Sequence, residues 1–150
     1  MALFTKRNKF NMQFIDYQES WQDAVIDLWQ ECGLTRPWND PVADILRKQS
    51  DQLGKFVLLV DESDLVASMM IGYDGHRGSV NYLAVLPKYQ TQGIGRKMMA
   101  YCEDYLTQLG CPKINICVRD SNVKVLDFYQ ELGYQPDPVV LLGKRLIADA

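Results

Sequence analysis

The sequence predicts one mixed α/β domain (α+β), in which a single sheet carries helices on its faces. Three observations support this. The chain has 150 residues, the length of one domain with its own core. Apolar residues follow strand-like spacing in some segments and helix-like spacing in others. Short turns join some of the expected strands and helices join others, so the sheet should contain both antiparallel and parallel neighbours.

The N-terminal third should form a strand and two helices. Residues 12–17 alternate apolar side chains, which indicates the first strand. Apolar residues over 21–32 recur on one helical face, and a glycine follows them. Asp40 as N-cap, with Pro41 in the first turn, then begins a helix that should run to about residue 52.

The rest of the chain should complete the sheet. The expected elements are strands at 55–61, 65–73 and 79–85, a helix at 95–109, a strand at 113–118, a helix at 122–132, and extended segments at Tyr134 and 139–146. The strands on either side of helix 95–109 should be parallel neighbours. The predicted order is therefore β-α-α-β-β-β-α-β-α-β-β.

Charge and composition argue against several classes of protein. The net charge of −3 does not suit a broad duplex-binding face, so no nucleic-acid partner is expected. No apolar stretch approaches about 18 residues, so no membrane-spanning helix is expected either. The four cysteines form no C-x-x-C pair and His76 is the only histidine, so no metal site is predicted. The cysteines are interpreted as buried, reduced thiols of a cytoplasmic protein.

The chain should be organised as a short leader and one domain. Residues 1–11 contain a basic cluster that no apolar stretch follows, so they are interpreted as a frayed leader rather than a signal peptide. Residues 12–150 should form a single domain, because no repeat, low-complexity segment or long linker divides them.

A glycine-rich stretch between an expected strand and helix indicates an anion site. Gly93 and Gly95 open the helix that follows strand 79–85. The first N–H groups of a helix lack intrahelical partners, its dipole adds about half a positive charge, and glycines let a pyrophosphate approach. The stretch matches neither a P-loop nor the dinucleotide fingerprint. By itself, the pattern is equally compatible with a flexible turn.

The wider arrangement resembles the GNAT superfamily of N-acetyltransferases. Gln90-x-x-Gly93-x-Gly95, following Val85-x-Pro87, is similar to the acetyl-CoA signature Q/R-x-x-G-x-G/A of that family. Asn122, followed by the segment 128–134, is similar to the family's N…Y-E-x-x-G-F/Y ending. The order of elements matches the GNAT-type acyl-CoA N-acyltransferase fold over 12–146. The segments 36–41, 72–78 and 142–146 resemble the small bacterial YpeA-like subgroup.

The resemblance implies acetyl-CoA as co-substrate and no metal. The implied cofactor-binding residues are Leu83, Ala84, Val85, Gln90, Gln92, Gly93, Ile94, Gly95, Arg96 and Asn122. Amides of 92–96 would hold the pyrophosphate, whereas the backbone of 83–85 would form a bulged strand that pairs with the pantetheine arm. One of these strand amides would polarise the thioester carbonyl. Arg96 either pairs a phosphate or is a solvated helix residue, and both interpretations stay open.

Tyr129 is the residue that the resemblance assigns to catalysis. It would protonate the departing thiolate. The alternative is a core tyrosine with a bonded hydroxyl, which its place on an amphipathic helix also favours.

The acceptor side is less well defined. The positions at which family members carry a glutamate base hold Asn81 and Cys117 here. A water chain, or an amine that enters deprotonated, is therefore expected instead.

Two further segments are candidates for contact with the acceptor. Arg36, Trp38 and Asn39 lie between the first two helices, the acceptor wall in this family, although Trp38 would serve equally as a hydrophobic staple. Asp74 and His76 either line the acceptor entrance or simply form a turn.

These observations predict an N-acetyltransferase that moves an acetyl group from acetyl-CoA to a primary amine by direct attack. The acceptor is a small-molecule amine or a protein amine, and a protein N-terminal or lysine acetyltransferase is the alternative within this class. A non-catalytic acyl-CoA-binding sensor is the alternative from another class, because no carboxylate base is found. A homodimer is compatible with either function.

Overall fold

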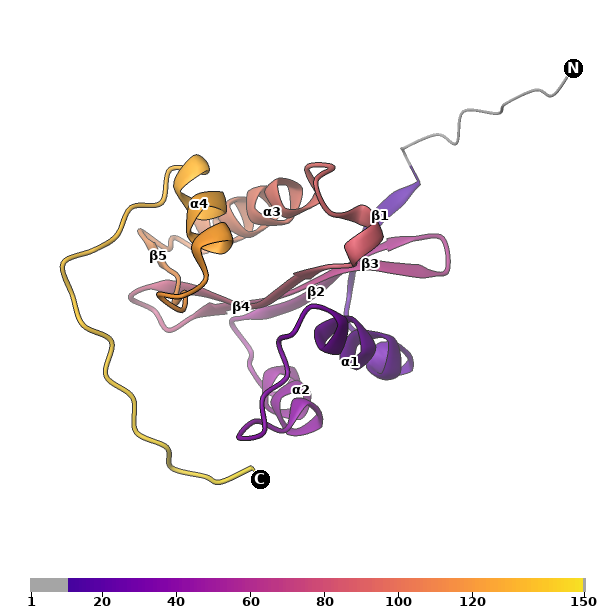
Figure 1. Cartoon of the computed structure of the whole chain (residues 1–150), viewed down its shortest axis with the longest axis horizontal. Coiled ribbons are helices and arrows are strands. Elements are labelled where there is room, and N and C mark those ends of the chain that lie inside the picture. Colours follow the sequence, from indigo (N-terminus) through magenta and orange to yellow (C-terminus); the bar gives the residue numbers. More distant parts are fainter. Residues whose placement is uncertain (1–10, 150) are drawn as a thin grey trace, which may run out of the picture.

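The computed structural model describes residues 11–149, and its centre is a five-stranded sheet (Figure 1). The strands lie in the order β1 (Met12–Asp16), β2 (Lys55–Asp61), β3 (Asp64–Tyr73), β4 (Gly78–Val85) and β5 (Ile114–Asn115). Neighbours from β1 to β4 are antiparallel, whereas β4 and β5 are parallel. The predicted mixed sheet and its parallel crossover are confirmed. Apart from Asn11, the predicted leader lies outside the described residues.

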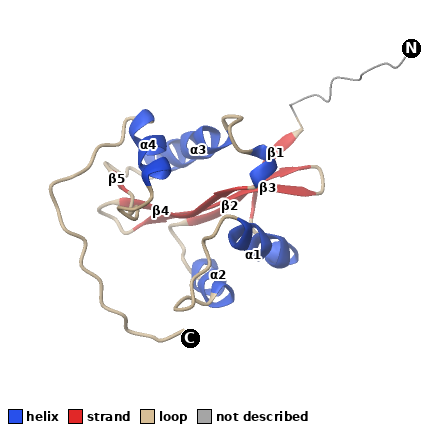
Figure 2. Cartoon of the chain, viewed as in Figure 1, coloured by secondary structure: helices blue, strands red, loops and turns tan. Residues whose placement is uncertain are grey.

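Helices cover both faces of the sheet (Figure 2). α1 (Gln22–Glu31) and α2 (Pro41–Gln49) lie on one face, and α3 (Ile94–Gln108) and α4 (Val123–Glu131) lie on the other (Figure 1). The 3-10 turns η1 (Glu19–Trp21) and η2 (Pro87–Tyr89) come before α1 and α3. Among residues 11–149, none of the helices combines the length and the apolar character needed to cross a bilayer.

The core consists of two clusters, one on each face of the sheet. Val57 and Leu59 of β2 pack with α3 and α4, whereas Leu58 and Phe56 pack with α1 and α2. Side chains of a strand alternate between faces, so a strand buried on both sides is apolar throughout. This explains the unbroken apolar run of β2.

α2 begins where the sequence predicts. Asp40 Oδ1 accepts hydrogen bonds from the amides of Val42 at 2.9 Å and Ala43 at 3.2 Å, and Pro41 occupies the first helical position. This cap satisfies two amides that have no partner within the helix.

The strands predicted at the C-terminus are absent from residues 11–149. After α4 the chain is irregular, and Val139–Leu142 are between 76% and 88% exposed. Pro136 and Pro138 cannot donate main-chain hydrogen bonds, and they directly precede this apolar segment. The tail ends instead on α2, where Arg47 donates two hydrogen bonds to Asp149 at 2.8 and 2.9 Å.

A β-bulge in β4 and the early end of β5 shape the middle of the sheet. Tyr82 and Leu83 together stand opposite Met69, because Asn81 pairs with Met70 and Ala84 with Ser68. The bulge therefore begins one residue before the predicted segment 83–85. β5 is also shorter than the predicted 113–118, since only two of its residues pair with β4. Beyond those pairs, the two strands diverge and leave an opening.

Candidate active site

Two pockets lie at the opening between β4 and the chain that follows β5. The pocket bounded by the start of α3 and by α4 has a volume of about 760 Å³, and we call it the α3 pocket. The pocket bounded by α2 has a volume of about 730 Å³, and we call it the α2 pocket. Both pockets are lined by the same wall of six residues: Cys32, Leu34, Leu83, Asn122, Val125 and Tyr129. Molecules held in the two pockets would therefore meet at this wall.

The α3 pocket brings together almost all of the predicted cofactor-binding residues. Those that line it are Leu83, Ala84, Val85, Gln90, Gly93, Ile94, Gly95, Arg96 and Asn122. The exception is Gln92, whose side-chain amide donates to the carbonyl of Lys88 at 3.2 Å.

The start of α3 fits an anionic group. Gly93 is the N-cap with φ +79°, and no side chain accepts a hydrogen bond from the first turn. A Cβ at Gly93 would have no described atom within 4 Å beyond its own chain neighbours, so no side chain fills the space beside this glycine. Free amides, open space and the positive end of the helix dipole are together what a phosphate requires.

Gly95 is needed for a different reason. A Cβ at this position would lie 3.0 Å from Cζ and 3.1 Å from Cε2 of Phe128 on α4. Its missing side chain therefore lets the first turn of α3 pack against α4. The sequence predicts that both glycines leave room for a phosphate; the space beside Gly93 is open, whereas the space beside Gly95 is taken by an aromatic ring.

The end of β4 is held by two side chains. The Gln90 amide donates to the carbonyl of Val85 at 2.9 Å, and the Cys32 thiol donates to the same oxygen at 3.3 Å. A carbonyl oxygen has two lone pairs, so that of Val85 has no acceptor capacity left for a ligand. A ligand that pairs with this strand must use other groups of 83–85.

The cysteines differ from the prediction that all four are buried. Cys102 is buried, Cys32 and Cys111 are half-buried, and Cys117 is exposed; all four are free thiols. Cys32 lies in the shared wall of the two pockets, and partial burial raises the pKa of its thiol.

Tyr129 combines a buried ring with an available hydroxyl. The side chain is 8% exposed, and its ring makes edge contacts with Phe128 at 5.0 Å and Tyr134 at 5.6 Å between centroids. Burial raises the pKa of the phenol to about 12, so it is protonated at neutral pH. Within residues 11–149 the hydroxyl forms no hydrogen bond to another protein group, and the residue lines both pockets.

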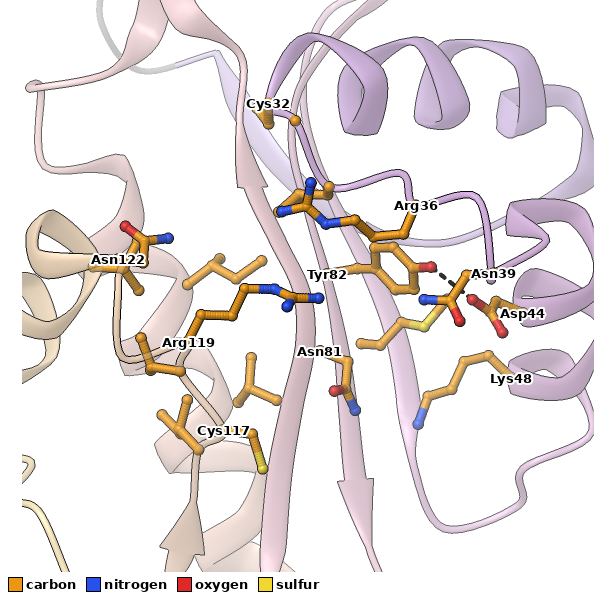
Figure 3. Close-up of a pocket in the computed structure, with 18 of the residues that line it drawn as sticks. Cys32, Arg36, Asn39, Asp44, Lys48, Asn81, Tyr82, Cys117, Arg119 and Asn122 are labelled. Carbon is orange, nitrogen blue, oxygen red and sulfur yellow. Dashed lines mark hydrogen bonds between the residues drawn. The ribbon is translucent and has the colours of Figure 1, made fainter. Parts of the chain in front are cut away.

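Tyr82 anchors the bulge of β4 at the α2 pocket. The residue has a φ of +51°, which is uncommon for a side chain of this size. Its ring stacks on Trp29 at 3.8 Å between centroids, and its hydroxyl donates to Asp44 at 2.6 Å (Figure 3). The buried Ser68 hydroxyl donates to the Tyr82 carbonyl at 2.9 Å and accepts from the Trp29 indole at 2.9 Å. Burial and the carboxylate of Asp44 hold the pKa of Tyr82 well above its ordinary value.

Only some of the predicted acceptor residues come together. Those that line the α2 pocket are Arg36, Asn39, Asn81 and Cys117 (Figure 3). Trp38 lies beside this group, with its ring 5.7 Å from the guanidinium carbon of Arg119. Asp74 and His76 line neither pocket. Asp74 accepts hydrogen bonds from the amides of His76 and Arg77, each at 2.7 Å, which is turn chemistry.

The sequence model of the Acetyltransferase (GNAT) family matches residues 11–134. This chain belongs to that family. An acetyltransferase of Yersinia pseudotuberculosis is 42% identical, over 92% of this chain and 98% of the relative. An acetyltransferase of Sodalis glossinidius is 46% identical, over 85% of this chain and 90% of the relative.

Solved structures of acetyltransferases share the fold. One from Streptococcus agalactiae has a TM-score of 0.77 and 16% identity, and the match covers 93% of each chain. An aminoglycoside N-acetyltransferase in complex with CoA has a TM-score of 0.73 and 14% identity, with 91% of this chain and 95% of the other covered. The chain is thus an acetyl-CoA-dependent N-acetyltransferase whose acceptor carries an amine.

The acetyltransferase has a polar face on α2 that sequence reasoning missed. Asp44, Arg47, Lys48 and Asp51 all line the α2 pocket. The three- and four-residue spacing of Asp44, Arg47 and Lys48 places them on one face of α2, and Asp51 follows just after the helix ends; this pattern was the available signal. Arg119 was missed as well, because it follows a two-residue strand and no periodic pattern marks it.

Proposed function

We propose that this acetyltransferase transfers the acetyl group to a primary amine by direct attack. Acetyl-CoA would occupy the α3 pocket and the amine would occupy the α2 pocket, with residues 12–150 acting as a single domain. The observation that carries this proposal is the shared wall, where Tyr129 and Asn122 belong to both pockets. Two reactants that enter from opposite sides would meet there beside one tyrosine hydroxyl.

The chain's own groups suit the parts of acetyl-CoA. When bound, this co-substrate supplies an acetyl group activated as a thioester. Amides of Gln92–Arg96 at the start of α3 would hold the pyrophosphate, and Gly93 leaves the space for it. Backbone groups of Leu83 and Ala84 would pair with the pantetheine arm, and Asn122 would contact the same arm.

Tyr129 would act as the general acid. The amine nitrogen forms a bond to the acetyl carbon and releases one proton to water, the carbon–sulfur bond breaks, and the sulfur leaves with the electron pair. The Tyr129 hydroxyl is protonated at neutral pH, since burial raises its pKa to about 12, and it would donate its proton to that sulfur. Water would then return a proton to the Tyr129 oxygen.

The amine would enter without its proton, or lose it to water. Both carboxylates that line the α2 pocket are already engaged: Asp44 accepts from Tyr82 and pairs with Arg47, and Asp51 pairs with Lys48. Neither of them is therefore free to receive the proton of an incoming ammonium group, and the hydrogen bond from Lys48 also lowers the pKa of Asp51.

Release of CoA during turnover tests the proposal. A panel of primary amines and short peptides is incubated with acetyl-CoA, and free thiol and acetylated product are measured together. Thiol and product should appear in equal amounts with at least one acceptor. A protein that binds acetyl-CoA but releases no CoA above background with any acceptor would be a sensor instead. The peptides separate protein amines from small-molecule acceptors.

A further inference from the structure

Two arginines in the α2 pocket have no acidic or hydrogen-bonding partner among residues 11–149. Arg36 lies between α1 and α2, and Arg119 follows β5. In Figure 3 their guanidinium groups extend from opposite sides of the pocket toward the space between them. Within residues 11–149, the side chain of neither forms an ion pair or a hydrogen bond.

The other charges of this pocket are paired. Arg47 binds the carboxylates of Asp149 and Asp44, and Lys48 binds that of Asp51. Asp44 also accepts from the hydroxyl of Tyr82. The pocket thus contains four basic and two acidic side chains, in a protein whose net charge is −3. The positive charge that remains is that of the two arginines.

Trp38 positions one of these arginines. Its indole lies 5.7 Å from the guanidinium carbon of Arg119, within the range of a cation–π contact. Such a contact orients the guanidinium without neutralising its charge. A planar guanidinium offers parallel N–H donors, which match the oxygens of a carboxylate or a phosphate.

We infer that the acceptor is an amine that also carries an oxyanion, a carboxylate or a phosphate, which binds between Arg36 and Arg119. This inference rests on the proposed function. The pocket volume of about 730 Å³ suits a small molecule, and the amine end would extend to the shared wall beside Tyr129. A polyamine or an aminoglycoside would bring further positive charge against two unpaired cations, which disfavours its binding.

Four amines of similar length test the charge requirement. 4-Aminobutyrate and 3-aminopropylphosphonate carry an anion, butylamine carries none, and 1,4-diaminobutane carries a second cation. We expect kcat/KM to be at least about tenfold higher for an anionic amine than for butylamine, and lowest for the diamine. Comparing kcat/KM for 4-aminobutyrate with kcat/KM for 3-aminopropylphosphonate shows which oxyanion is preferred.

Arginine variants identify the residues responsible. Arg36→Ala and Arg119→Ala should each lower kcat/KM for the preferred anionic amine by a factor at least about tenfold larger than the factor for butylamine. Arg119→Glu should shift the preference toward the diamine. Arg77→Ala is the matched control, because Arg77 lies in the connection between β3 and β4 and lines neither pocket. Thermal unfolding verifies that each variant is folded.

Two outcomes would overturn the inference while acetyl transfer stands. One is a kcat/KM for butylamine or the diamine that equals or exceeds that for the anionic amines. The other is an equal loss of kcat/KM for all four amines in the arginine variants. If no amine is acetylated, the proposed function fails. The inference about the oxyanion is then decided by the binding of acetylated amines to the CoA-loaded protein. The CoA-loaded protein should bind N-acetyl-4-aminobutyrate more tightly than N-acetylbutylamine, and Arg36→Ala should abolish the difference. Equal binding, or no binding of either at millimolar concentration, would overturn it.

Discussion

At the residue scale, Tyr129 shows how one side chain serves packing and chemistry together. Tyr129 belongs to the core and also lines both pockets. The burial that the ring needs also raises the pKa of the phenol, because a phenolate would lose its hydration. The same feature therefore keeps the proton on the oxygen until a thiolate accepts it.

Tyr129→Phe separates these two contributions, because it keeps the ring and removes only the proton donor. We expect turnover to fall at least about tenfold, since general acid catalysis contributes typically about 10²–10⁴-fold. The dissociation constant of acetyl-CoA should change less than about tenfold. Steady-state kinetics and calorimetry on the same sample measure both quantities. Unchanged turnover together with a lower melting temperature would mean that Tyr129 is a core residue only.

The pH profile gives a second prediction at this scale. The amine must be deprotonated to attack, so kcat/KM should rise with pH up to the pKa of the amine. A general acid works below its own pKa, and that of Tyr129 is about 12. Deprotonation of Tyr129 should therefore not lower kcat/KM of the wild-type enzyme at any pH up to about 10. A descending limb near pH 8 or 9 in wild type, absent from Tyr129→Phe, would contradict the assigned pKa.

At the element scale, the start of α3 and the bulge of β4 bring the site together. Gly93 ends the connecting loop in a left-handed conformation, which lets the helix begin with its amides facing the α3 pocket. The bulge at Tyr82 alters the strand beside the opening, and Ser68 and Trp29 support it from the core.

Gly93→Ala tests the loop. A methyl group would have open space around it, so the cost is that of φ +79°, about 1–2 kcal/mol of folding stability. Affinity for acetyl-CoA should fall as well, because a loop that relaxes toward negative φ turns its amides away. Denaturant unfolding and calorimetry give the two values. Gly110→Ala is a control, since it has a similar φ of +82° with open space but lines neither pocket. Equal losses of affinity in both variants would refute a specific role for Gly93.

Elements set by contacts between residues close in the sequence were predictable. Elements that must pair with a strand far away in the sequence were not. Asp40 fixes the start of α2 through its own neighbours, so the prediction there was correct to the residue. Val139–Leu142 has strand-like composition, but a strand also needs a partner, and β5 pairs at two residues only. In the same way, the loop motif predicted residues of the α3 pocket, whereas Arg36 and Arg119, which are far apart in the sequence, come to line one pocket only through the tertiary fold.

At the scale of the whole molecule, charge and exposure are unevenly distributed. The chain is acidic overall, yet its α2 pocket has a basic surplus. The apolar side chains of the core are buried between the sheet and its helices, whereas those of Val139–Leu142 are exposed. The backbone of the tail runs away from the sheet after α4 (Figure 1).

Leu142→Lys tests the position of the tail. Leu142 is 88% exposed, so the charge should change folding stability by no more than about 0.5 kcal/mol. Leu59→Lys is the contrasting variant, because Leu59 is fully buried in β2 and a lysine there should prevent folding at moderate temperature. Thermal unfolding compares them. A large loss of stability in Leu142→Lys would mean that the tail is buried against the sheet or against a second copy, and gel filtration would tell these apart.

The contact between Gly95 and Phe128 has a consequence for how related sequences vary. The signature that this chain resembles accepts either Gly or Ala at its last position, but here an alanine methyl group would lie 3.0 Å from the Phe128 ring. The two positions are 33 residues apart and should therefore change together. Relatives with alanine at the position of Gly95 should carry a side chain smaller than phenylalanine at the position of Phe128. Relatives that keep phenylalanine at the latter position should keep glycine at the former.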